Sequence, residues 1–177
     1  MSSIRSLIDQ NAAQKLVSAF VLSRLDYCNS LLFGIPDHNI KKLQQIQNSA
    51  ARIVSKSKKY NHITPILKEL HWLPVKARVE YKAATLAFNS YNDIGPSYLN
   101  QVVRPYIPPR TLRSKNNNLA VSHNFNRITF GKRSFSYFGP HIWNNLSNDL
   151  RKLDSIDSFK RNLKTHLFNK YFNLSTS

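Results

Sequence analysis

The sequence has few of the residues from which catalytic and metal centres are usually built. Its single cysteine, Cys28, excludes a disulfide framework and a zinc site made of thiolates. Its four glycines form no Walker A, G-x-G-x-x-G or G-x-S-x-G motif, and its six histidines lack the H-E-x-x-H spacing. We therefore expect no metal and no cofactor. Cys28 lies in an apolar stretch, which favours a small buried side chain over a nucleophile.

Acidic residues are also scarce. Nine Asp or Glu stand against 26 Lys or Arg, which gives a net charge of +17. Two-metal phosphoryl transfer needs clustered carboxylates, and the chain has no Asp-Asp or Asp-x-Asp pair. Only Asp154 and Asp157 lie within a helical turn of each other, and they are typical of a helix start. We predict no catalytic residue and no enzymatic activity by the chain itself.

Long apolar runs are missing as well. The longest apolar stretch, residues 16–33, is interrupted by Arg24 and Asp26, so no membrane span is expected. The first residues do not have the pattern of a secretory signal. With its lone cysteine, the chain is expected inside the cell, in the nucleus or the cytoplasm.

Hydrophobic residues make up 41% of the chain, with ten Phe and eight Tyr, which is too many for a disordered basic tail. Eight prolines divide it into pieces with helical periodicity. A first helix with apolar residues on most of its circumference should begin after Asp9 and end before Gly34. Pro140 argues against one uninterrupted helix over residues 134–146. The other helices are predicted over residues 37–56, 64–70, 75–91, 97–103 and 155–172, and two short strands of a hairpin over 119–122 and 127–130.

These elements predict a mainly α fold with a small irregular α+β part at the C-terminus. Residues 1–103 form a helical segment, and residues 104–117 form a basic linker that contains Pro and Asn. Residues 118–177 form the α+β segment, which ends in an amphipathic helix.

The basic residues gather at four places. The first group lies at the end of the helix predicted over residues 37–56, next to Tyr60. Its charges could equally well cap the negative end of the helix dipole or contact phosphates. Those in the linker favour nucleic acid, because an extended arm can follow a backbone groove. Those beside Phe135 and Trp143 accompany aromatic rings that we expect mainly in the core. Those on the last helix fit an ordinary solvated face too. The candidate residues are, in this order, Arg52, Lys56, Lys58 and Lys59; Arg104, Arg110 and Arg113; Lys132 and Arg133; and Lys160, Arg161 and Lys164.

Each group of basic residues taken alone has an ordinary structural explanation, but the total charge favours a polyanion as the partner. A protein that neutralises about six to ten phosphates binds nucleic acid strongly and loses that affinity as salt rises. An acidic membrane surface is less favoured, because no helix combines a strong basic face with exposed Trp or Phe. We therefore expect RNA or DNA, contacted through the backbone, as the partner.

Several blocks resemble a known family. Residues 23–34, SRLDYCNSLLFG, are similar to a stretch downstream of the polymerase core in reverse transcriptases of non-LTR retrotransposons, the jockey-like and chicken-repeat-like LINE elements. Further blocks follow in the same order over nearly the whole chain: LQQIQNSAARIV at 43–54, HITPILKELHWLPV at 62–75, PSYL at 96–99, RTLRS at 110–114, FGPHIWNNL at 138–146 and the stretch 158–168.

The resemblance implies thumb-like helices and the piece that follows them, a region expected to contact template RNA, primer or target DNA. The polymerases of these elements carry an aromatic-Ala-Asp-Asp metal motif in their palm, which this sequence lacks. The resemblance therefore implies a truncated C-terminal portion of an RNA-directed DNA polymerase, for which the implied partners are nucleic acid and the remainder of such a polymerase. Matching positions add His71 to the binding candidates, with Arg52, Trp72, Arg110, Arg113 and Trp143 also on matching positions.

Two alternatives share the basic composition. A structural RNA binder like a ribosomal protein would carry the same charge, usually with fewer aromatic residues and a long basic tail. A remnant that binds no nucleic acid would use its basic face, and the apolar first helix, to dock on the missing polymerase.

Overall fold

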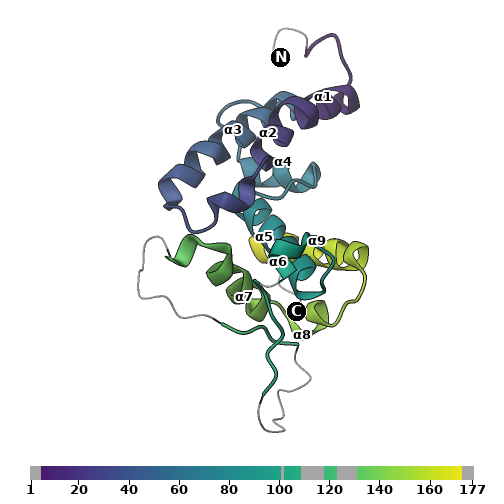
Figure 1. Cartoon of the computed structure of the whole chain (residues 1–177). Helices are drawn as coiled ribbons and strands as arrows, with labels where there is room; N and C mark the ends of the chain where they lie inside the picture. Colours follow the sequence, from purple (N-terminus) through teal and green to yellow (C-terminus); the bar gives the residue numbers. More distant parts are fainter. Residues whose placement is uncertain (1–4, 101, 109–117, 123–130, 173–177) are drawn as a thin grey trace. The chain divides into compact units, whose positions relative to one another are not determined.

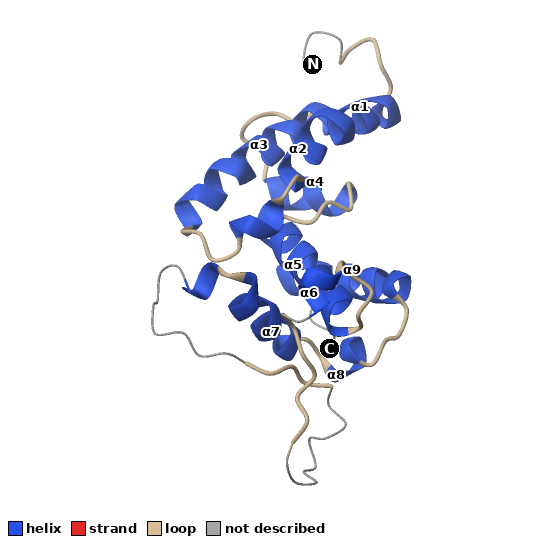
Figure 2. Cartoon of the chain, in the orientation of Figure 1, coloured by secondary structure: helices blue, strands red, loops and turns tan. Residues whose placement is uncertain are grey.

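The computed structural model describes residues 5–100, 102–108, 118–122 and 131–172, and these residues are mainly helical (Figures 1 and 2). The predicted mainly α class is confirmed. The small β part is not shown: within the described ranges, β pairing is limited to one antiparallel bridge, between Pro105 and Ala120. The predicted strand at 119–122 thus contributes only this bridge. The Tyr106 N–H donates to the Leu119 carbonyl, and Pro108, the next position whose N–H would face the same segment, has no N–H to donate. The other predicted strand, 127–130, lies outside the described residues.

The chain forms two compact units. Unit 1 comprises residues 1–79 and 167–177, and unit 2 comprises residues 80–166. Two long helices, α5 (Val75–Tyr91) and α9 (Ile156–Phe172), contribute residues to both. The limits of the segments predicted from composition, at 103/104 and 117/118, fall within unit 2, so those segments stay a prediction.

Unit 1 packs its helices around one apolar core. Trp72, Leu67 and Val54 are buried there together with Phe172 from the end of α9. In Figure 1 α1 lies beside α3, at the purple and blue end of the chain. The elements of unit 1, besides parts of α5 and α9, are α1 (Gln10–Val17), the π-helix η2 (Ser18–Leu22), α2 (Ser23–Asp26), the 3₁₀ helix η3 (Asn29–Leu32), α3 (Asp37–Ser55) and α4 (Ile63–Glu69).

The first helix begins as predicted but ends earlier. The Asp9 carboxylate accepts a 2.6 Å hydrogen bond from the Ala12 N–H, which is the expected N-cap. The helix stops at Asp26, not at residue 33, because Tyr27 is extended and Cys28 has a left-handed φ of 50°. The turn at this point accompanies an ion pair between Asp26 and Arg78 of α5.

Two expectations about this stretch were wrong. Cys28 is exposed, because it sits at the turn and not inside a helix. The apolar residues are also not covered on all sides: Val17 and Leu22 are buried, whereas Phe20 is 66% exposed and Leu31 is 76% exposed.

The predicted helix at 37–56 is confirmed as α3. Its apolar spacing, at Ile40, Leu43, Ile46, Ala50 and Ile53, predicts a buried face that differs in part from the one observed. Ala50 and Val54 are buried, yet so is the amide of Gln47, while Ile46 is half exposed. Gln47 tolerates burial because its Nε2 donates to the Leu73 carbonyl at 2.8 Å and its Oε1 accepts from Gln44 at 2.9 Å.

Unit 2 is built around aromatic rings. Phe88 of α5 stacks on Phe159 of α9 at 4.3 Å between centroids, and Trp143 lies 6.1 Å from Phe88. The core position predicted for Trp143 is confirmed, and Phe135 is half-buried. Besides parts of α5 and α9, unit 2 contains α6 (Ser97–Asn100), the 3₁₀ helix η5 (Gly131–Arg133), α7 (Phe135–Asn145) and α8 (Asn148–Arg151).

Helix α7 continues through Pro140, contrary to the expectation of a break. Pro140 is fully buried in the middle of the helix, so packing compensates for the missing N–H. The helix ends at Asn145, where Arg151 caps it. The Arg151 Nη1 donates to the Asn144 carbonyl at 2.9 Å and to the Leu146 carbonyl.

Candidate nucleic-acid interface

The best-defined candidate surface is the loop that follows α3, residues 56–62, which we call the basic loop. It begins at Lys56, whose φ of 54° turns the chain out of the helix. The Lys56 N–H and the Ser57 N–H both donate to the Arg52 carbonyl, the latter at 3.1 Å. This is a left-handed C-cap of a kind usually made by glycine.

The Arg52 side chain braces this loop from the last turns of α3. Its Nη2 donates to the Asn61 carbonyl at 3.2 Å. Its Nε is buried, and no partner for that atom is found within the described part of the chain. Arg52 therefore fixes the far end of the loop while one of its donors remains unused.

The end of α3 is capped by Arg5, a residue that no pattern in the sequence singles out. Its Nε donates to the Ile53 carbonyl at 2.8 Å, and its Nη2 donates to the Val54 carbonyl at 2.7 Å. A third bond runs from Nη1 to the Ile8 carbonyl at 2.8 Å. Nothing in the sequence indicates this contact, because 48 positions separate Arg5 from Ile53.

The lysines of the basic loop are thus not needed to satisfy those carbonyls. Lys56, Lys58 and Lys59 are all exposed, and within the described ranges none of them forms an ion pair. The Lys58 Nζ lies 5.8 Å from the ring centroid of Tyr60, which is itself 78% exposed. Three cations and an accessible aromatic ring are therefore presented within five residues.

His71 occupies a different part of unit 1. It is exposed with a left-handed φ of 53°, and its N–H donates to the Lys68 carbonyl at 3.0 Å. Its ring lies 6.0 Å from that of Phe168. His71 thus lies just after α4, and its ring is close to the last turns of α9. The neighbouring Trp72 is part of the core.

The basic candidates on α9 belong to unit 2. Phe159 and Leu163 are buried, and Arg161 and Lys164 are exposed on the other side of the helix, as the apolar stripe predicted. Lys160 is half-buried. The Arg161 Nη2 lies 3.4 Å from the Ser158 hydroxyl, a contact within one turn.

The remaining candidates are described only in part. Arg104 is exposed beside the bridge at Pro105, and its carbonyl accepts from the Val121 N–H at 2.9 Å. Arg133 is exposed at the end of η5. Arg110 and Arg113 lie outside the described residues, as does the side chain of Lys132.

The described part of the chain shows neither a metal site nor a membrane-spanning helix. No three His, Cys, Asp or Glu side chains come together there in a way that could hold a metal ion. No helix within the same residues is long and apolar enough to cross a membrane.

Comparison of the chain with protein-family models, curated proteins and solved structures finds no match.

Proposed function

We propose that this chain binds RNA or DNA through a basic surface whose best-defined part is the basic loop. The observation that carries the proposal is that Arg5, and not the lysines of the basic loop, bonds to the carbonyls of Ile53 and Val54 at the end of α3. Arg5 satisfies two of the last carbonyls of α3, and the lysines at 56, 58 and 59 remain exposed near Tyr60 without an ion pair to any described residue. Helix capping alone therefore does not account for them.

The chemistry of this loop suits a nucleic-acid backbone. Lysine ammonium groups contact phosphates as point charges and release counterions, so they add affinity without reading the sequence. An exposed tyrosine ring offers a surface on which an unpaired base can stack, and every base has a face that can do so. We therefore expect binding with little base specificity and a preference for single strands.

We further propose that the chain corresponds to the C-terminal portion of a non-LTR retrotransposon reverse transcriptase, without its catalytic palm. The blocks that carry this resemblance include buried residues such as Trp72, Gly139 and Trp143. A shared fold would require such residues. The same blocks contain Arg52, which braces the basic loop.

The first test is a salt titration. A labelled single-stranded RNA or DNA of about 20 nucleotides is titrated with the protein, and anisotropy is followed from about 50 to 300 mM salt. We expect Lys58→Gln combined with Lys59→Gln to reduce the slope of log K against log salt by about 1.4, because each contact to a single strand contributes about 0.7. Lys41→Gln combined with Lys42→Gln is the matched control, since it removes two adjacent exposed charges from α3 of the same unit.

Two results would contradict the proposal. The first is equal slopes for the two double variants, which would mean that the basic loop makes no phosphate contact. The second is an absence of binding at micromolar protein in the lowest salt. A primer-extension assay with Mg²⁺ or Mn²⁺ is run in parallel, and any template-dependent incorporation would show that the chain is a polymerase after all.

A second measurement tests stacking. We expect Tyr60→Ala to weaken single-strand binding about tenfold, since stacking on an aromatic side chain contributes about 1 to 3 kcal/mol per base. The salt slope should not change, because no charge is removed. Tyr60→Phe keeps the ring and should bind within about twofold of the natural chain; equal losses for both variants would argue against stacking.

A further inference from the structure

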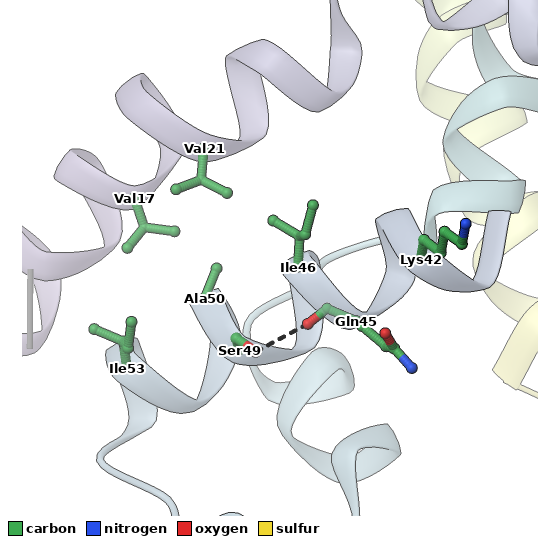
Figure 3. A pocket seen from close by; sticks show the side chains of 8 residues that line it. All are labelled: Val17, Val21, Lys42, Gln45, Ile46, Ser49, Ala50 and Ile53. Atoms are coloured by element: carbon green, nitrogen blue, oxygen red, sulfur yellow. Dashed lines mark hydrogen bonds between the residues drawn. The ribbon is translucent and has the colours of Figure 1, made fainter. Parts of the chain in front are cut away.

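A second surface of unit 1 is an open groove between the first helical stretch and α3. Its volume is about 370 Å³, and it is lined by Val17 and Val21 on one side and by six residues of α3 on the other. Figure 3 shows the two valines directed toward Ile46, Ala50 and Ile53 across the groove. The remaining lining residues are Lys42, Gln45 and Ser49.

The groove is shaped by the π-helix η2. The Ser23 N–H donates to the Ser18 carbonyl, five residues earlier, so one turn contains an extra residue. The Ala19 carbonyl accepts from the Ser23 hydroxyl. Turns of this kind often mark functional sites in α-helices. Here the turn connects Val17, which is buried, to Val21, which is only partly covered.

The α3 side presents a stripe with the spacing of a helix-binding groove. Positions 42, 46, 49, 50 and 53 share one face, and the side chain in the middle, Ile46, is 50% exposed. The Ser49 hydroxyl does not present a free donor to the groove, since it donates back to the Gln45 carbonyl at 3.0 Å. An apolar floor of this form suits the apolar stripe of another helix, with anchors at i, i+3 or i+4, and i+7.

Charge decides the kind of occupant. Lys42 is the one charged residue that lines the groove. Unit 1 contains thirteen Lys or Arg and four Asp or Glu, so a second copy of the chain would bring like charge to the same face. A partner with acidic residues beside its apolar stripe would be attracted, and its carboxylates could reach Lys42.

We propose that this groove is the docking site for an amphipathic helix of a partner protein, with acidic residues flanking its apolar stripe. The proposal goes beyond nucleic-acid binding, because it concerns a different surface and a protein partner.

The experiment uses synthetic helical peptides of about 18 residues as probes. The acidic peptide has Leu at i, i+3, i+4 and i+7 spacing with Glu at most other positions. A second peptide replaces Glu by Lys, and a third has the acidic composition in scrambled order. Binding of each to the whole chain is measured by fluorescence polarisation. We expect the acidic amphipathic peptide to bind at least about tenfold more tightly than the other two.

Substitutions then locate the site. Lys42→Glu should weaken binding of the acidic peptide about threefold to tenfold and strengthen binding of the basic one, as expected for a reversed charge pair. Lys41→Glu is the matched control, because Lys41 is exposed on the same helix but does not line the groove, and it should change both affinities less than twofold. Ile46→Gln should weaken binding about tenfold by removing the apolar anchor, whereas Leu31→Gln, an exposed apolar residue on η3, should not. Circular dichroism verifies that each variant is folded.

Three results would overturn the proposal. Equal affinity for the ordered and the scrambled acidic peptides would show that only net charge is sensed. Equal effects of Lys42→Glu and Lys41→Glu would place the peptide elsewhere. Self-association in analytical ultracentrifugation that is abolished by Ile46→Gln would identify a second copy of the chain as the occupant.

Discussion

The guanidinium of Arg5 donates a 2.7 Å hydrogen bond from Nη2 to the main-chain oxygen of Val54, 49 positions further along the chain. Because Arg5 also reaches Ile53 and Ile8, one buried side chain joins the start of unit 1 to the last turn of α3. The basic loop begins directly after that turn. The geometry of the proposed binding loop therefore depends on a residue that does not belong to it.

We expect Arg5→Ala to lower the free energy of unfolding by about 2 to 4 kcal/mol, because two helix carbonyls lose a charged donor. Arg5→Lys should recover only part of this loss, since an ammonium group lacks the planar fork that serves several carbonyls at once. Urea unfolding followed by circular dichroism measures both. Lys15→Ala, an exposed change on α1, is the control and should stay within about 0.5 kcal/mol. A similarly small effect of Arg5→Ala would mean that water caps the helix equally well.

Gln47 links α3 to the segment that leads into α5. Its amide bonds to the Leu73 carbonyl and to Gln44, and the Oε1 of Gln44 accepts from the Val75 N–H at 2.8 Å. We expect Gln47→Met, which keeps the volume but removes the amide, to cost about 1 to 3 kcal/mol, because a buried carbonyl loses its partner. Gln45→Met tests the same replacement at an exposed position of the same helix and should be nearly neutral. If both variants unfold at the same urea concentration, the amide network contributes nothing to stability.

These contacts show which features the sequence could predict. Periodicity located α5 over Val75–Tyr91 and α3 to within one residue, because a long amphipathic helix has many positions that agree. It failed where one contact between positions far apart in the sequence outweighed the pattern. The first helix ends at Asp26, where the carboxylate meets Arg78, 52 positions away, and such a pairing leaves no trace in nearby residues.

The basic residues of the candidate site could be predicted from the sequence, but the contacts that surround them could not. The lysines after α3 were evident as a cluster, but the sequence did not indicate that Arg5 supplies the hydrogen bonds to the carbonyls of Ile53 and Val54. The burial of Gln47 was not predicted either, because glutamine is usually a surface residue and this one lies in the core. Pro140 was expected to interrupt a helix, and its burial inside α7 could not be read from its neighbours.

Alkaline pH should destabilise unit 2 through the half-buried phenols of Tyr81 and Tyr91. Burial raises the pKa of Tyr91 above its ordinary value of 10.0, an effect that the nearby Arg151 guanidinium partly offsets, and burial also raises the pKa of Tyr81. Above pH 10 the unfolded chain therefore releases these protons before the folded chain does, so the free energy of unfolding falls as pH rises. Tyr81→Phe combined with Tyr91→Phe should reduce this decline, measured by urea unfolding between about pH 9 and 11. Tyr98→Phe, at an exposed position, should leave the decline as it is; an unchanged decline in the double variant would contradict the assignment.

Gly139 is packed so closely in unit 2 that even a methyl group should not fit. A Cβ at this position would lie 2.9 Å from Cγ2 of the buried Val103 and 3.1 Å from Cε2 of Phe135. Alanine would favour the helical backbone of α7 by about 1 kcal/mol, but overpacking costs about 1 to 3 kcal/mol. Because Val103 is β-branched and fully buried, it cannot move aside easily, and we expect Gly139→Ala to be destabilising by about 1 kcal/mol net.

Substitution of Val103 separates the gain in helix propensity from the cost of overpacking at position 139. Val103→Ala removes the atom that Gly139→Ala would meet, so in that background the same change should be neutral or stabilising. A double-mutant cycle from urea unfolding should therefore give a coupling of at least about 1 kcal/mol between positions 103 and 139. If the two changes are additive within about 0.5 kcal/mol, the methyl group is accommodated by movement of Phe135, and the close contact with Val103 does not explain why glycine occupies this position.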